Sequence, residues 1–115
     1  ILLEGIWDKE MKTLAEGFFA KLLSGDGNID LDEKNRNLPQ GRIKITDGNL
    51  NYLKDYEKLM KKFGFNPKLK EKYIIVRSSF NLEQAKWLLS IGAFKNNPNE
   101  ARLKLFVNLR VQLNK

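Results

Sequence analysis

The sequence contains no cysteine and no histidine among its 115 residues. Without cysteine, the chain has no disulfide framework and no thiolate metal site. Without histidine, it cannot use Ser–His or Cys–His nucleophilic catalysis, the usual zinc sites or an imidazole base. Any reaction that this chain catalyses must therefore use carboxylates, lysine, water and a bound metal ion.

Long apolar runs are missing as well. No segment approaches the roughly 20 apolar residues that a membrane-spanning helix requires, and the first residues do not show the pattern of a charged-then-apolar leader. We therefore expect an intracellular protein, in the cytoplasm or in an organelle, without a membrane partner. The chain begins at Ile1 instead of methionine, so we expect it to be either trimmed or a piece of a longer protein.

The remaining composition is that of a folded domain with an uneven charge. Hydrophobic residues make up 42% of the chain, so we expect one domain over residues 1–115 with a modest core. The net charge is +7, and it is divided unequally. Residues 1–33 contain three Lys against eight acids, a balance of −5, whereas residues 34–115 contain eighteen Lys or Arg against six acids, a balance of +12. This division favours a polyanionic partner with a metal ion held at the junction, although a basic surface alone is common in soluble proteins.

Hydrophobic periodicity and turn residues predict an α+β fold of order α-ββ-α-ββ-α, with one further helix at the end. The expected sheet has four antiparallel strands, with helices on one face and the other face open. Asp8, Asn49 and Asn81 are expected to cap three helices, and Asn97-Pro98-Asn99-Glu100 has the form of a capping box before the last one. The predicted elements are a helix from Trp7-Asp8 to about Ser24, strands at 28–32 and 42–46, a helix at 50–63, strands at 68–70 and 73–77, and helices after Asn81 and Asn97.

The first helix carries apolar residues at helical spacing. Leu14, Phe18 and Leu22 recur four residues apart, and Phe19 and Leu23 lie one step round the helix. This spacing predicts a buried stripe along the helix.

The first helix ends at Ser24-Gly25-Asp26-Gly27. Glycine permits a positive φ, so we expect a sharp turn that leaves the Asp26 carboxylate projecting from the helix end. An Asp-Gly pair after a helix is also a routine turn, and on its own Asp26 would be interpreted as structural.

Alternation in the strands predicts one basic face of the sheet. If Ile43, Ile45 and Leu69 face the core, then the side chains on the opposite face are mostly cationic: Arg42, Lys44, Lys68, Lys70, Lys72 and Arg77. A sheet with such a face fits the DNA major groove, where Lys and Arg contact guanine edges or phosphates. The alternative is a solvated face whose lysines protect the strand edges.

The first strand differs from the others, because its outward residues are Asn28, Asp30 and Asp32. An acid beside DNA repels phosphate unless the acid is paired. An aspartate there can accept a hydrogen bond from cytosine N4 or help to position an arginine.

The stretch Phe19-Ala20-Lys21-Leu22-Leu23-Ser24-Gly25-Asp26-Gly27 resembles the motif that names the LAGLIDADG homing endonucleases, and the order of elements agrees with that family over nearly the whole chain. The resemblance implies that two such helices pack side by side and that the sheet lies across the DNA major groove. It also implies that Asp26, with the Gly25 carbonyl, holds Mg²⁺ or another hard divalent cation at the scissile phosphates.

The resemblance implies two further site residues. Asp47 matches a position at which many members place a polar residue near the attacking water. The family often has a lysine before the final helix; an ungapped match places that position at Asn97, and the nearest lysine is Lys95, which we take as the candidate.

Lys21 departs from the family pattern, because its position is normally small and packed against the partner helix. A long charged side chain is costly to bury there. We therefore expect Lys21 at the rim of the helix pair, with Gly17, Ala20 and Ser24 at the contact instead.

Together these features predict a site-specific, divalent-metal-dependent endonuclease that cuts both strands of DNA in intron or intein homing. The expected partner is a second copy of the chain, or a second LAGLIDADG domain, bound through the helix Leu14–Ser24. The alternative is a non-cleaving nucleic-acid-binding protein on the same scaffold, either an RNA maturase or a DNA-binding regulator. A third interpretation, one half of a fused two-motif protein, changes the partner and keeps the chemistry.

Overall fold

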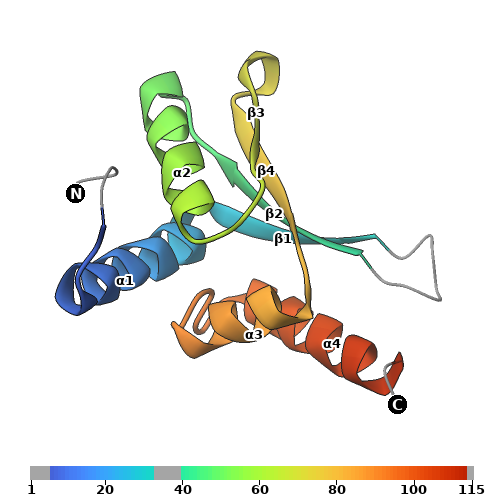
Figure 1. Ribbon diagram of the computed structural model, residues 1–115. Coiled ribbons are helices and arrows are strands. Elements are labelled where there is room, and N and C mark those ends of the chain that lie inside the picture. Colours follow the sequence, from blue (N-terminus) through green and yellow to red (C-terminus); the bar gives the residue numbers. More distant parts are fainter. Residues whose placement is uncertain (1–5, 33–39, 114–115) are drawn as a thin grey trace.

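The computed structural model describes residues 6–32 and 40–113 as an α+β fold (Figure 1). The order of elements is the one that the sequence predicts, and the predicted loop at 33–40 lies outside the described residues except for Gln40. The elements are α1 (Lys9–Asp26), β1 (Gly27–Asp32), β2 (Gln40–Thr46), α2 (Leu50–Lys62), β3 (Lys68–Lys70), the 3₁₀ helix η1 (Glu71–Tyr73), β4 (Ile75–Phe80), α3 (Leu82–Ser90) and α4 (Pro98–Leu113).

The four strands form one antiparallel sheet in the order β1-β2-β4-β3. Alternation places the buried side chains on one face of the sheet, where they join apolar residues of the four α-helices in one core. The sheet residues of this core are Ile29, Ile43, Ile45, Val76 and Phe80. Figure 1 shows α2 beside the β3–β4 hairpin and α3 lying together with α4. The helices therefore cover one face and leave the other for the basic side chains.

Polar side chains fix the starts of the helices, as the sequence predicts. Asp8 Oδ1 accepts from the Met11 N–H at 2.8 Å, and Asn49 Oδ1 accepts from the Asn51 N–H at 3.0 Å. Asn81 forms a full capping box, in which each partner accepts the other's backbone N–H. These bonds satisfy donors that the first helical turn leaves without partners.

The last helix begins at Pro98, where the missing N–H of proline costs nothing. The Asn97 side chain accepts from the Asn99 N–H at 2.9 Å, which confirms Asn97 as the cap. The predicted capping box does not form, because the Asn97 N–H donates to the Phe94 carbonyl at 3.0 Å and not to the Glu100 side chain. The Glu100 carboxylate lies 3.6 Å from the Lys104 ammonium, one turn further along the helix.

The end of α1 differs from the sequence prediction in two ways. The helix continues through Ser24 to Asp26, so Asp26 is its last residue and not part of a turn after it. The change into β1 uses no positive φ, since Gly27 has φ −90° and ψ 162°. A glycine is required at 27 for another reason: a Cβ there would lie 2.7 Å from the Leu23 carbonyl oxygen.

The β3–β4 hairpin also differs from the prediction. The strand expected at 73–77 is β4, which begins at Ile75 and continues to Phe80. Tyr73 and Lys72 belong to the 3₁₀ turn η1, so Lys72 does not alternate with Lys68 and Lys70 on the sheet face. The turn closes at Ile74, which has a left-handed conformation with φ 53°.

The stripe predicted along α1 is only partly buried in the single chain. Phe19 and Leu23 are fully buried and Leu22 is nearly so, as expected. Leu14 and Phe18 were predicted to lie in the same buried stripe, yet they are 67% and 43% exposed. The two residues lie on the side of α1 that faces away from the core.

The outer edge of β1 is covered by α4. Ile29 donates its N–H to Asn99 Oδ1 at 3.1 Å, and Arg102 Nη1 donates to the Ile29 carbonyl at 3.4 Å and to Asn28 Oδ1 at 3.3 Å. These two side chains occupy the N–H and carbonyl of Ile29, which an edge strand would otherwise present to another chain.

None of the helices in residues 6–32 and 40–113 has the length and apolarity that crossing a membrane requires.

Candidate functional site

The C-terminal end of α1 is an exposed, electronegative corner. Asp26 and Gly25 are both exposed, and a Cβ on Gly25 would meet nothing within 4 Å. The last turn of α1 contains no basic residue. The final carbonyls of a helix carry partial negative charge, so a carboxylate at this position creates a place that a cation would stabilise.

Asp47, the second candidate carboxylate, lies between β2 and α2 and is fixed by two hydrogen bonds. Its N–H donates to the carbonyl of Ile74 at 3.4 Å, and its Oδ1 accepts from the Asn49 N–H at 2.8 Å. The strained turn at Ile74 and the start of α2 therefore meet at Asp47.

Tyr56 of α2 links the two carboxylates electrostatically. Burial raises the pKa of Tyr56 most, and the negative charges of Asp47 and then Asp26 raise it further. The strand register agrees with this: Gly27, the residue after Asp26, pairs with Ile45, two residues before Asp47, so the two carboxylates lie in one region of the molecule.

The turn between α3 and α4 is held against the end of α1. Ser24 Oγ accepts from the Phe94 N–H at 3.0 Å, and Asn97 Nδ2 donates to the Ser24 carbonyl at 3.0 Å. Lys95 follows Phe94 directly and is exposed. The backbone beside Lys95 is thus fixed close to the end of α1, within two residues of Asp26.

The described residues of a single chain do not form a complete metal site. Within residues 6–32 and 40–113 there is no group of three or more Asp or Glu side chains arranged around one point. The exposed Asp26 carboxylate and the open backbone at Gly25 fit a hard cation, which prefers carboxylate and carbonyl oxygens. The residues fit Mg²⁺ as a half-site that a second chain, nucleic-acid phosphates and water would complete.

The open face of the sheet carries a row of cations across three strands. Lys44 of β2 pairs with Arg77 of β4, which pairs in turn with Lys68 of β3. Like charges placed directly opposite each other on neighbouring strands destabilise a sheet. The row continues to Asn28 of β1, two residues after Asp26, so the cations and the candidate metal ligand lie at the same end of the sheet.

The predicted basic residues converge on this face, apart from Lys72. Arg42, Lys68, Lys70 and Arg77 line one hollow of about 360 Å³ together with Ser78 and Ser79. Arg42 and Lys44 both contact Asp30 Oδ2, at 3.1 and 3.2 Å. The acid that the sequence leaves unexplained on this face is therefore paired with two cations.

The outward side of α1 presents a stripe with a cation in its middle. Leu14, Phe18, Lys21 and Gly25 follow one another at intervals of four, three and four residues, and all are exposed. Of the contact predicted at Gly17, Ala20 and Ser24, only Gly17 is exposed: Ala20 is buried within the single chain, and the Ser24 hydroxyl donates to the Ala20 carbonyl and accepts from the Phe94 N–H.

A comparison with models of known protein families identifies the family of this chain. The family model described as a LAGLIDADG-like domain matches residues 13–89. The chain belongs to the LAGLIDADG-like domain family. The LAGLIDADG match runs from the second turn of α1 to the last turn of α3 and so contains most of α1, the complete sheet and the basic face. It confirms the family that the motif in α1 suggested and the fold that goes with it.

The family match also bears on function in general terms. LAGLIDADG proteins bind DNA, are typically endonucleases and generally use a divalent metal. No curated protein matches this chain. The family therefore suggests DNA binding and cleavage of the homing type.

Sequence reasoning missed the polar residues that connect the LAGLIDADG helix to α4. Asn97 was recognised as a cap residue and as the ungapped match to the family's lysine, Asn99 only as part of the cap, and Arg102 was not singled out. In the structure Asn97 binds the end of α1, while Asn99 and Arg102 bind the edge of β1. The Asn97-Pro98-Asn99 signal was visible, but its partners are about 70 residues away in sequence and could not be identified from it.

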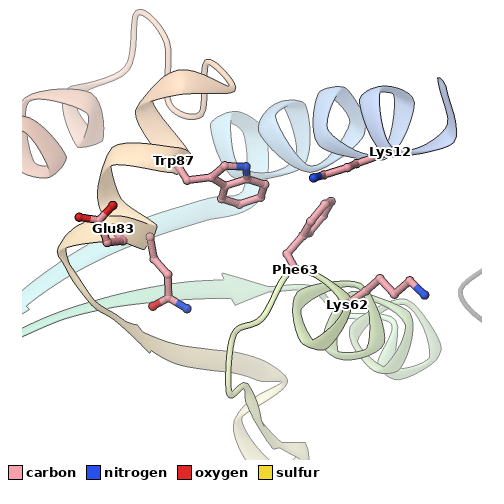
Figure 2. A pocket seen from close by; sticks show the side chains of 6 residues that line it. Lys12, Lys62, Phe63, Glu83 and Trp87 are labelled. Carbon is pink, nitrogen blue, oxygen red and sulfur yellow. The ribbon is translucent and has the colours of Figure 1, made fainter. Parts of the chain in front are cut away.

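A second hollow lies on the helix side, far from Asp26. Figure 2 shows Phe63 and Trp87 turned toward each other with Lys12 beside them, and the ring centroids are 4.9 Å apart. Its volume is about 290 Å³. Lys12 is fourteen residues before Asp26, which corresponds to about 21 Å along the helix axis. This hollow is therefore separate from both the basic face and the end of α1.

Proposed function

We propose that this LAGLIDADG domain is part of a metal-dependent, site-specific endonuclease that cuts both strands of DNA. One observation carries the proposal: the exposed Asp26 carboxylate lies two residues before Asn28, which pairs across the strands with Lys44, the first cation of the row on the open face of the sheet. A polyanion lying on the cations is thereby brought to the only exposed acid at the end of the motif helix.

The basic face supports binding in the DNA major groove. Lys44, Arg77 and Lys68 repel one another across adjacent strands, and phosphates or guanine edges would relieve that repulsion. Exposed Lys68 and Lys70 lie on β3 at the edge of the sheet and suit phosphate contacts, which dominate affinity. The half-buried Arg42 and Arg77 suit base contacts nearer the centre of the face.

Asp26 and the Gly25 carbonyl would hold Mg²⁺ together with the same groups of a second motif. Bound there, the ion would supply an activated water and stabilise the charge that develops on the leaving oxygen. The chain's own contribution is to place the carboxylate: the Asn97 amide fixes the last turn of α1, and Gly27 lets the following strand leave at once. Asp47, oriented by the Asn49 N–H, would hold a water near the scissile phosphate, and Lys95 would approach the same phosphate from the α3–α4 turn.

The proposed assembly places the outward side of α1 against a second motif helix. Leu14 and Phe18 are exposed apolar residues in the single chain, and Gly25 leaves room for a neighbouring backbone. Lys21 lies inside this stripe, so a symmetric pair must turn the two ammonium groups outward, and a partner helix with an acid would pair with Lys21 instead. The partner is a second copy of the chain or a second LAGLIDADG domain.

One observation favours the non-cleaving alternative. At the position that an ungapped match gives to the family's lysine, this chain has Asn97, and the Asn97 amide is used to bind the Ser24 carbonyl. If exposed Lys95 does not replace that lysine, then the chain would bind DNA or RNA through the basic face without cutting it.

The test is incubation of the protein with a library of plasmids that carry randomised duplex inserts, with Mg²⁺ and in parallel with a chelator. Ligation of adapters to new double-strand ends recovers any cleaved sequences. The proposal predicts recovery of related sequences with Mg²⁺ and none with chelator. Selective retention of duplexes without any cleavage would support the binding alternative, and the absence of both binding and cleavage would refute the two functions together.

A further inference from the structure

Asp30 is an acid in the middle of the basic face. It lies on β1 directly opposite Arg42 on β2, and Lys44 is the next residue along on the same face. One oxygen, Oδ2, contacts Arg42 Nη2 at 3.1 Å and Lys44 Nζ at 3.2 Å. The three side chains are only partly covered, with 35% of the Asp30 side chain exposed, so DNA on this face would lie against the whole group.

The pairing has two physical consequences for a polyanion. The three side chains together carry one positive charge, where Arg42 and Lys44 alone would carry two, and this weakens the sequence-independent attraction to phosphate. The contact to one Nη atom also limits where the guanidinium can lie. Arg42 also lines the hollow that Lys68, Lys70 and Arg77 share, and its strand β2 lies between β1, which carries Asp30, and β4.

Part of the Arg42 guanidinium remains accessible to a ligand on this face. Its contact with Asp30 is made by Nη2, and 40% of the side chain is exposed. The Nε is buried without a hydrogen-bond partner within the described residues, so DNA would meet the Nη groups and not this atom. A guanidinium that is held at one Nη and retains further N–H donors is prepared for a rigid, two-point contact, and the O6 and N7 acceptors of guanine provide such a contact.

We propose that Asp30 is a positioning residue that sets DNA specificity: it orients Arg42 and Lys44 toward one base pair and suppresses binding to unrelated sequence. This inference rests on the proposed DNA-binding function and assigns the acid a part in it. Asp30 makes the complex with random duplex weaker and the discrimination among sequences stronger. Electrostatic complementarity often acts in this way, on selectivity more than on affinity.

The test compares the unmodified chain with Asp30→Asn, which keeps the shape of the side chain and removes its charge. The control is Glu83→Gln on α3, an exposed residue on the helix side, because it changes the net charge by the same amount. Asp30→Glu is the rescue variant, since it restores the charge. The probes are a labelled random-sequence duplex and a pool of randomised duplexes for selection, used with the full chain at several salt concentrations.

We expect Asp30→Asn to bind the random duplex about threefold to tenfold more tightly, with a salt slope steeper by about one. Sequences selected by Asp30→Asn should lose about tenfold of their preference at one or two adjacent base pairs. Glu83→Gln should bind both probes as the unmodified chain does. Asp30→Glu should restore the affinity for the random duplex to that of the unmodified chain. If the unmodified chain selects a sequence and Asp30→Asn selects the same one with unchanged background affinity, the inference fails and the proposed function stands. If the unmodified chain binds no duplex, both fail.

Discussion

Gly27 lies directly on the backbone of Leu23, four residues before it. The Gly27 N–H donates to the Leu23 carbonyl, and a Cβ on Gly27 would lie 2.7 Å from that oxygen and 2.8 Å from the Leu23 Cα. Leu23 is fully buried, so it cannot move aside without disturbing the core. This contact lets α1 pass into β1 without a loop and places Asp26 at the junction.

Gly27→Ala should therefore destabilise the fold by about 1–3 kcal/mol, because the added methyl group is forced against buried backbone. Gly25→Ala is the matched control: its Cβ would meet nothing within 4 Å, and alanine is favoured over glycine in a helix by about 0.5–1 kcal/mol. Urea unfolding measures both. Equal stability of the two variants would show that the close approach at Gly27 does not constrain this junction.

Asp30 should make stability depend on pH. The hydrogen bond from Lys44 is the largest influence on its carboxyl and lowers the pKa; partial burial opposes this, and the charges of Lys44 and Arg42 lower the pKa further. A carboxyl whose folded pKa is lowered contributes stability above its unfolded pKa, and that contribution is lost as the pH falls through the folded value. Because the group is partly exposed, Asp30→Asn should cost only about 0.5 kcal/mol at neutral pH.

The measurement is urea unfolding of Asp30→Asn and the unmodified chain from neutral pH down to below the ordinary carboxyl range, together with an NMR titration of the Asp30 carboxyl. The stability difference should disappear at the acid end. A difference that is the same at every pH would mean that the ion pairs with Lys44 and Arg42 do not contribute.

Much of this fold could be predicted from the sequence, because its signals are local. The caps at Asp8, Asn49 and Asn81 and the alternation around Ile43 identify elements and faces within a few residues. The exposure of Leu14 could not be predicted in this way, since apolar spacing does not distinguish a core from a surface that awaits a partner.

The candidate site was less predictable than the fold. The motif identified Asp26, but the Ser24–Phe94 and Ser24–Asn97 hydrogen bonds join residues 70 or more positions apart. The role of Asp30 was open for the same reason, because its partners lie on the next strand and the pairing depends on register.

Binding to random duplex should depend on Lys68 and Lys70. Both are exposed on β3, and replacing both with alanine should reduce the slope of log affinity against log salt by about two, or by about one for each lost phosphate contact. Lys54→Ala with Lys58→Ala on α2 is the control, because these exposed lysines belong to the helix that covers the other face. Equal slopes for the two double variants would place the DNA contact elsewhere.

Association through α1 should depend on Leu14. Leu14→Gln should change the stability of the single chain by no more than about 0.5 kcal/mol, since the side chain is 67% exposed, yet weaken assembly. Leu105→Gln on α4, also exposed, is the control. Sedimentation velocity over a range of concentrations, with DNA and Mg²⁺ present, measures the effect. A chain that stays monomeric under all these conditions would contradict self-association and leave a second LAGLIDADG domain as the partner.

The most direct test of the central claim is the rate of double-strand cleavage by Asp26→Asn on a sequence that the unmodified chain cuts. The substitution removes the charge that would hold Mg²⁺ and keeps the size of the side chain at the exposed end of α1. We predict that cleavage falls by at least about a thousandfold, while affinity for the same duplex changes by less than about threefold. Cleavage at the unmodified rate with Asp26→Asn would contradict the account.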